Sequence, residues 1–187
     1  MTELYSSCET NNEITLAHVI MTWHIATWHF EISEANRTFA VEAANRLVAT
    51  SLSKYCAYLV AFAPELVPGS PIETQSMLDE LVNDARKALR GTSDIYKRLQ
   101  ELQNEGTESL IFAESAILGM KLEIMEEVTR WNLLADFWAE LMLYIAPSDN
   151  VAGHIEHLAQ GGESVTHVWA LLMHAGILER PAAASAI

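Results

Sequence analysis

The sequence contains few of the residues that break a helix or cross-link a chain. Its 187 residues include two cysteines, five prolines and eight glycines. Two cysteines cannot form the disulfide framework of a small secreted domain, so we expect a reducing compartment. The few prolines and glycines separate long stretches in which apolar residues recur at three- and four-residue spacing, and this pattern favours helices over strands.

Basic residues are also few. Eleven Lys and Arg stand against 25 Asp and Glu, which gives a formal net charge of -14. Such a charge repels phosphate backbones and anionic membrane surfaces within a Debye length of about 8 to 10 Å, so we expect no nucleic-acid partner. Five of the basic residues fall within residues 86–98. They leave two alternatives open there: a local anion site, or ordinary charges at helix ends and in water.

No apolar run is long enough to cross a bilayer. The most apolar windows, residues 55–63, 133–146 and 165–178, are each shorter than the roughly 20 residues that a spanning helix needs. The N-terminal residues are acidic and contain no arginine before Arg37, unlike a signal or transit peptide. We therefore predict a soluble protein of the cytoplasm or nucleus, without direct membrane insertion.

Half of the residues are hydrophobic, which is at the top of the usual range for soluble domains. We predict an all-α fold, a single compact bundle of about seven or eight helices over residues 14–178, with flexible ends at residues 1–13 and 179–187. Residues 91–108 form the most polar stretch and are the expected mobile connection. The expected helices cover residues 15–32, 36–63, 71–90, 93–104, 107–120 with an extension to 127 left open, 129–145, 151–160 and 163–174.

The clearest start signal is Ser70-Pro71-Ile72-Glu73. Serine is a good cap, and proline is tolerated in the first turn, where its missing N–H has no partner to lose. A helix is therefore predicted to begin at Pro71.

The most unusual segment covers residues 154–176. It places four of the seven histidines, a double glycine and a tryptophan in an otherwise apolar stretch. Buried polar groups must be satisfied internally, since unpaired burial costs a few kcal/mol each, so the segment indicates either a structural hydrogen-bond network or a site. We expect a network that links Trp23 or His24 to Glu140 and to His154, Glu163 or His167, beside a turn at Gly161-Gly162. The full set of candidate residues is Trp23, His24, Glu140, His154, His157, Glu163, His167 and His174.

Metal binding and catalysis lack a complete motif. The sequence has no His-Glu-x-x-His, no cysteine pair and no Glu-x-x-His, so no metal ligand set can be named. The stretch around Ser164 has glycine on one side only and no preceding strand, so it is no nucleophile elbow. For Glu140 we favour a partner inside the fold, and for Glu163 a helix cap, over roles as catalytic acids. We predict no metal, no cofactor and no catalytic residue.

Several motifs follow one another along the chain. They are Trp23-His24-Ile25-Ala26-Thr27, Leu52-Ser53 with Tyr55 and Pro64-Glu65, Trp131, Trp138 and Glu140 with Tyr144 and Ala146, and the block from His154 through Gly161-Gly162-Glu163, Thr166 and Trp169 to His174 and Gly176.

With these motifs, the chain resembles plant proteins with the domain of unknown function 594, a family expanded in grasses, over about residues 14–178. The family has no assigned activity, so the resemblance implies no catalytic residue. Typical members place this region after a multi-helix membrane domain, which implies that this chain is the C-terminal part standing alone. The chain differs from them in having Leu66 where members often have methionine, and in the polar stretch 91–108.

These observations predict a non-enzymatic helical module for protein interaction or regulation. Its expected partner is another protein, which includes a second copy or a membrane-anchored relative, bound through apolar surface. The alternative is a small-ligand or metal-binding protein, or an enzyme that uses the His and Glu side chains of the C-terminal helices.

Overall fold

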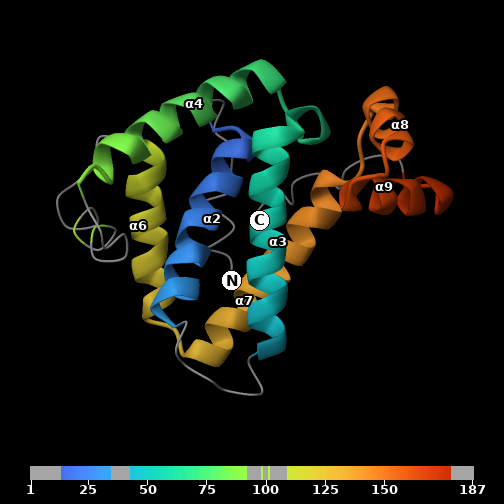
Figure 1. The fold of residues 1–187 in the computed structure, drawn as a ribbon. Helices are drawn as coiled ribbons and strands as arrows, with labels where there is room; N and C mark the ends of the chain where they lie inside the picture. The colour runs from blue at the N-terminus through green and yellow to red at the C-terminus, as the bar shows by residue number, and fades with distance from the viewer. Residues whose placement is uncertain (1–13, 35–42, 92–97, 99–100, 102–108, 178–187) are drawn as a thin grey trace, which may run out of the picture.

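The computed structural model describes residues 14–34, 43–91, 98, 101 and 109–177, and the regular structure in these residues is entirely helical (Figure 1). This confirms the all-α prediction. The predictions for residues 1–13, 36–42 and 179–187, and most of those for residues 91–108, lie outside the described part. The described elements are α2 (Leu16–Ser33), α3 (Ala43–Phe62), the 3-10 helix η2 (Pro64–Leu66), α4 (Pro71–Ala88), α6 (Leu110–Glu123), α7 (Glu127–Ile145), α8 (Val151–Ala159) and α9 (Ser164–His174).

Four helices form the body of the molecule. Helix α2 packs between α3 and α6, and α3 also packs along α7. Helix α4 crosses one end of these helices, from the end of α3 towards α6 (Figure 1). Helices α8 and α9 project from the end of α7 on the side away from α6, so the chain has a bundle and a C-terminal extension.

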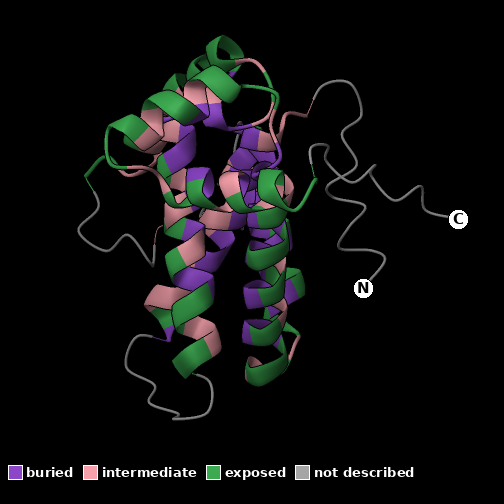
Figure 2. Ribbon diagram, turned by 90° about the vertical axis from the view of Figure 1, so that its right-hand side faces the viewer, coloured by how far each residue is buried: buried purple, intermediate pink, exposed green. Residues whose placement is uncertain are grey.

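The core lies along the inner sides of α2, α3 and α7 (Figure 2). Trp131 and Trp138 on α7 are both fully buried. The Trp138 indole Nε1–H donates a hydrogen bond to Thr27 Oγ1 at 3.1 Å, and Thr27 Oγ1 donates to the Trp23 carbonyl at 2.8 Å. This chain of hydrogen bonds satisfies a buried indole and fixes α7 on α2.

Helix ends follow local sequence signals at two places. The Ser70 hydroxyl accepts a hydrogen bond from the Glu73 N–H at 3.4 Å, and Thr15 Oγ1 accepts one from the His18 N–H at 3.3 Å. Both are N-caps that satisfy otherwise unpaired amides. The predicted start of α4 at Pro71 is confirmed. The extension of the 107–120 helix to residue 127 is wrong, because α6 ends at Glu123 and a new helix begins at Glu127.

A buried polar cluster that the sequence did not predict closes one end of the bundle. The Glu34 carboxylate pairs with the Arg130 guanidinium and accepts a hydrogen bond from the Trp131 Nε1–H at 2.8 Å. Arg130 also donates to the carbonyls of Leu122 and Met125 at the end of α6. The cluster thus holds α2, α6 and α7 together at this end.

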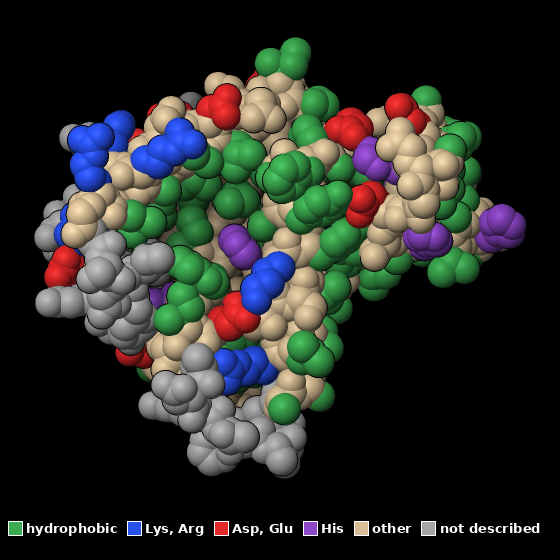
Figure 3. Space-filling model, in the orientation of Figure 1, with side chains coloured by type: hydrophobic (Ala, Val, Ile, Leu, Met, Phe, Trp, Pro, Cys, Tyr) green, Lys and Arg blue, Asp and Glu red, His purple; other side chains and the backbone are tan. Residues whose placement is uncertain are grey.

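The basic residues at the end of α4 fit their ordinary role. Arg86 and Lys87 lie in the last turn of the helix, where a positive charge interacts favourably with the helix dipole, and Lys87 pairs with Asp84 at 3.1 Å. Figure 3 shows basic side chains at this end of α4, on the outside of the molecule. Within the described residues, no helix combines the length and the apolar character needed to cross a membrane.

Candidate functional site

Helices α8 and α9 and the turn between them form a unit that we call the C-terminal hairpin. The turn is made by Gly161 and Gly162, which have φ angles of 116° and 78°, a region that favours glycine. The Gly162 N–H donates a hydrogen bond to the His157 carbonyl at 2.8 Å. A Cβ on Gly162 would lie 2.5 Å from Cε1 of the His167 ring. The predicted turn is therefore present, and the positive φ angles favour glycine at both positions.

The interior of the hairpin holds a stacked aromatic pair. His154 on α8 is fully buried, and its ring lies parallel to that of Trp169 on α9, with centroids 4.7 Å apart and an interplanar angle of 5°. The pair joins the two helices of the hairpin face to face. His154 is thus an interior residue, as its apolar surroundings in the sequence suggest.

Two tyrosines of α3 bind the start of α9. The Tyr55 hydroxyl accepts a hydrogen bond from the Val165 N–H at 3.0 Å and donates one to Glu163 Oε2 at 3.3 Å. The Tyr58 hydroxyl donates to Glu163 Oε1 at 3.0 Å. Glu163 occupies the N-cap position, but its side chain makes no cap bond. The prediction that Glu163 caps the helix is therefore wrong in mechanism: Tyr55 caps α9, and Glu163 joins the two tyrosines.

A second set of contacts fixes α8 to η2. His157 Nε2 and Glu65 Oε1 lie 2.7 Å apart. Asn150 caps α8 by accepting a hydrogen bond from the Gly153 N–H at 3.0 Å, and its Nδ2 donates to the Glu65 carbonyl at 3.0 Å. The hairpin is thus attached to the bundle at two separate places.

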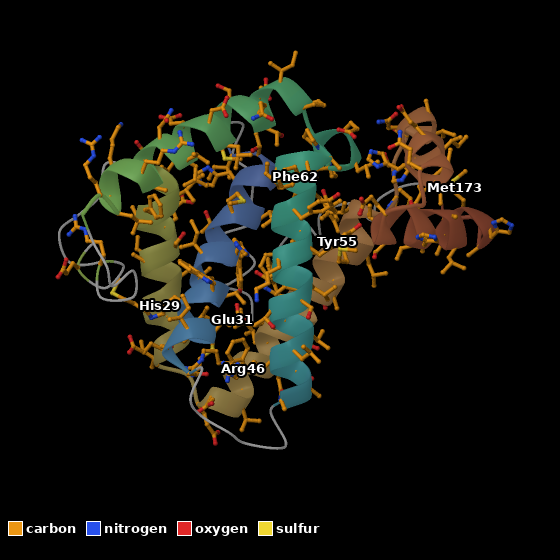
Figure 4. The ribbon with its side chains drawn as sticks, viewed as in Figure 1. His29, Glu31, Arg46, Tyr55, Phe62 and Met173 are labelled. Atoms are coloured by element: carbon orange, nitrogen blue, oxygen red, sulfur yellow. The ribbon has the colours of Figure 1, made fainter. Side chains whose placement is uncertain are left out.

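An aromatic ladder runs along α3 beside the hairpin (Figure 4). The rings of Tyr55 and Tyr58 stack with centroids 6.1 Å apart, and those of Tyr58 and Phe62 stack at 5.3 Å. Exposure rises along the ladder: Tyr55 is partly buried, Tyr58 is 41% exposed and Phe62 is 74% exposed. We call Tyr55, Tyr58, Phe62 and Glu163 the corner, because they lie where α3 meets α9.

The pKa values of the two tyrosines of the corner are raised. Burial raises the pKa of Tyr55 to about 12, with the hydrogen bond from Val165 acting in the opposite direction. The hydrogen bond to the Glu163 carboxylate raises the pKa of Tyr58. Burial also raises the pKa of the neighbouring Cys56 to about 12. Both tyrosines and the thiol therefore remain neutral near pH 7, which favours hydrogen-bond donation over nucleophilic chemistry.

Trp23 and His24 have partners inside the bundle. Trp23 stacks on Phe137 with centroids 3.7 Å apart, and His24 Nδ1 lies 2.9 Å from Ser53 Oγ, where burial lowers the histidine pKa. These contacts lie in the bundle and do not involve the hairpin. The link from Trp23 or His24 to the C-terminal histidines stays a prediction.

Three predicted residues lie on outward faces. Glu140 is exposed on α7, so its predicted place inside the fold is wrong: two residues after the buried Trp138, a helix has turned by about 200° and presents its outer side. His167 and His174 are exposed on α9. Each donates its Nδ1–H to a carbonyl one turn back, on Glu163 at 2.9 Å and on Ala170 at 3.1 Å.

In the part of the chain that the structure describes, no three His, Cys, Asp or Glu side chains are grouped to hold a metal ion.

Tyr58 and Phe62 are absent from the residues predicted for the site, and Tyr55 is named only as part of a family motif. Tyr55, Tyr58 and Phe62 follow one another at three- and four-residue spacing, which places them on one face of a helix. That spacing was a usable signal. What it could not show was the contact with Val165, which lies 110 residues further along the chain.

The fold and this site define a class: an all-helical bundle with a C-terminal helical hairpin docked on it through tyrosines and a carboxylate. Residues 123–177 match the family described as Protein of unknown function, DUF594. The match covers α7, α8 and α9, and it confirms the resemblance for this segment. Searches of curated proteins and of solved structures gave no match.

Proposed function

We propose that this chain is a non-enzymatic helical module that binds another protein at the corner. The observation that carries the proposal is the aromatic ladder of α3, which ends in Phe62 at 74% exposure. A large aromatic side chain in water gives up favourable burial, and aromatic residues are enriched among the side chains that dominate protein interfaces.

The corner is also held in place before any partner arrives. Tyr58 is fixed by its hydrogen bond to Glu163 and by its stacking on both neighbours in the ladder. Ordering flexible side chains opposes association, so a surface that is already ordered loses less free energy on binding. This arrangement supports recognition of a partner more than turnover of a substrate.

Charge indicates what the partner carries. Residues 131–177 contain five acidic residues, Asp136, Glu140, Asp149, Glu156 and Glu163, and no lysine or arginine. Of the five, Glu163 lies in the corner itself. An apolar surface that contains a carboxylate favours a partner that presents apolar side chains flanked by basic ones, because complementary potentials speed association and select among partners. We therefore expect an apolar, basic segment of another protein at the corner.

The hydrogen bonds of the histidines support a structural role over a catalytic one. His157 lies against Glu65, and the ring Nδ1–H of His167 and of His174 is used by its own helix. A general base needs a nitrogen poised towards a substrate and a nearby group that orients it. These histidines instead have partners that stabilise helices α8 and α9.

Affinity capture with matched variants tests the proposal. The tagged wild type is compared with Phe62→Glu and with Ile72→Glu, which introduces the same charge at an apolar residue of α4 that is 83% exposed. Both variants should keep the helical circular-dichroism spectrum of the wild type. We expect proteins captured by the wild type and by Ile72→Glu to be lost with Phe62→Glu. An identical set of captured proteins in all three experiments would contradict the proposal.

A further inference from the structure

Helix α6 is apolar on both its inner and outer sides. Its inner side packs on α2 through buried residues such as Ile111, Leu118 and Leu122. Its outer side, continued by the first residue after the helix, carries four exposed apolar residues: Leu110 at 59%, Ile117 at 50%, Met120 at 47% and Ile124 at 88%. A helix that is hydrophobic all round is normally covered all round.

Helix α2 shows what such a helix looks like when it is covered. It is also apolar on all sides, and it lies between α3 and α6, with residues buried on both flanks. Helix α6 lies at the edge of the bundle and packs mainly on α2 (Figure 1). One side of α6 therefore has the composition of an interior surface and faces outward.

The outer residues of α6 follow a coiled-coil spacing. Leu110, Ala113, Ile117, Met120 and Ile124 are separated alternately by three and four residues. This is the repeat by which two helices pack along a common seam, with each side chain inserted between those of the other helix. We call these five residues the α6 seam.

The charges beside the seam favour a second copy of α6, in the antiparallel orientation, as its partner. Glu114 and Lys121 lie seven residues apart on the same flank of the seam, and Ala116 and Glu123 lie on the other flank. Glu114 Oε2 already lies 2.7 Å from His18 Nε2 on α2 of the same chain, so the second carboxylate oxygen is the one left for a cation of another copy. If a second α6 runs antiparallel, with Ile117 facing Met120 of the second copy, each Lys121 faces Glu114 of the other chain. Each Glu123 then faces Ala116, so no like charges meet. A parallel pairing forms neither ion pair.

We propose that this chain self-associates through the α6 seam, as a two-fold symmetric pair with antiparallel α6 helices. The seam closes on itself, since each copy offers the same surface to the other. Helix α6 lies on the opposite side of the molecule from the C-terminal hairpin (Figure 1). Pairing therefore leaves the corner of each copy open, and it goes beyond the proposed function and does not depend on it.

The expected affinity is modest. A contact made by one helix of each copy is at the small end of stable interfaces, so we expect monomer and dimer to exchange over the micromolar range. Light scattering after size exclusion and sedimentation equilibrium over a concentration series measure this directly. A wild type that stays monomeric throughout would overturn the proposal.

Variants locate the contact. Ile117→Glu places a charge in the middle of the seam, and we expect it to remain monomeric. Val82→Glu is the matched control: it adds the same charge at an exposed valine of α4 and should dimerise like the wild type. If Ile117→Glu dimerises as well as the wild type, the seam is not the interface.

A charge exchange tests the antiparallel register. Lys121→Glu should raise the dissociation constant by about tenfold or more, because the substituted carboxylate would then face the Glu114 carboxylate of the other chain. The double variant Glu114→Lys with Lys121→Glu restores opposite charges, and the single variant Glu114→Lys is its control because both lose the contact with His18. We expect the double variant to dimerise more tightly than either single variant. A double variant that is no tighter than the single variants, with an unchanged circular-dichroism spectrum, would contradict this register. Phe62→Glu should dimerise like the wild type. The proposal of partner binding at the corner and the proposal of pairing through the α6 seam can therefore fail independently.

Discussion

The substitution Tyr55→Phe removes one oxygen atom from the junction between α3 and the C-terminal hairpin. That oxygen accepts the Val165 N–H at 3.0 Å and donates to Glu163 at 3.3 Å. Val165 is fully buried, so water has little access to replace the lost acceptor. The N–H at the start of α9 is then left without its cap.

The size of the effect follows from that burial. An unsatisfied buried donor costs about 1 to 3 kcal/mol, and for a chain of this size each kcal/mol lowers the melting temperature by about 2 to 4 °C. Tyr58→Phe is the matched control, since it removes the other hydroxyl that binds Glu163. Tyr58 is 41% exposed, so water can take the place of its hydroxyl and the loss should be smaller.

Two measurements check this reasoning. Urea denaturation followed by circular dichroism gives the free energy of unfolding of both variants, and hydrogen exchange gives the protection of the Val165 amide. We expect Tyr55→Phe to be the less stable variant and to lose that protection. Equal stability of the two variants, or an unchanged exchange rate at Val165, would contradict the claim that the Tyr55 hydroxyl caps α9.

The remaining predictions concern the buried groups of the bundle. Glu34→Gln leaves the buried Arg130 charge without its carboxylate, so it should lower the free energy of unfolding in urea by about 3 to 5 kcal/mol. Glu31→Gln breaks the more exposed pair with Lys54 and should lower it by less than about 1 kcal/mol. Similar losses in the two variants would contradict the argument from burial. Burial lowers the pKa of His24 below 6.5, so as the pH falls the His24 ring is protonated in the unfolded chain before it is protonated in the folded one. The contribution of the neutral ring to stability is therefore present above pH 6.5 and is lost as the pH falls through the folded-state pKa. Below pH 6.5 the melting temperature of His24→Gln should fall less steeply with pH than that of the wild type. An equal slope would show that His24 does not contribute to this pH dependence. The pKa of Tyr55 is raised from 10.0 to about 12, so its contribution is present below pH 10 and lost as the pH rises towards 12. Between pH 10 and 12, Tyr55→Phe should lose less stability than the wild type. Equal losses would contradict the raised pKa of Tyr55.

Local signals in the sequence predicted the helices well. Ser70 and Pro71 identify the start of α4, and Gly161-Gly162 identifies the turn of the hairpin, because capping and positive φ are decided by a few neighbouring residues. Contacts between distant residues were not predictable in this way. Glu34 and Arg130 lie 96 residues apart, and only the packing of α2 on α6 and α7 brings them together.

Glu140 and the histidines show why a polar residue in an apolar stretch is ambiguous. Both His154 and His167 lie among apolar neighbours in the sequence, yet the first is buried against Trp169 and the second is exposed. The rotation of each helix about its axis decides between these outcomes, and packing against the bundle sets that rotation. Glu140 is exposed for the same reason, although Trp138 beside it is fully buried.

Site-specific photo-crosslinking at the corner tests the proposed interaction most directly. A photoreactive phenylalanine analogue replaces Phe62, and in a matched chain it replaces Ile72, which is at least as accessible on α4. In a cell extract we expect the probe at residue 62 to form a discrete adduct with another protein. Excess wild-type chain should suppress this adduct and excess Phe62→Glu should not, while the probe at residue 72 should not form it. The same adducts from both positions, or none from residue 62, would contradict a docking surface at the corner.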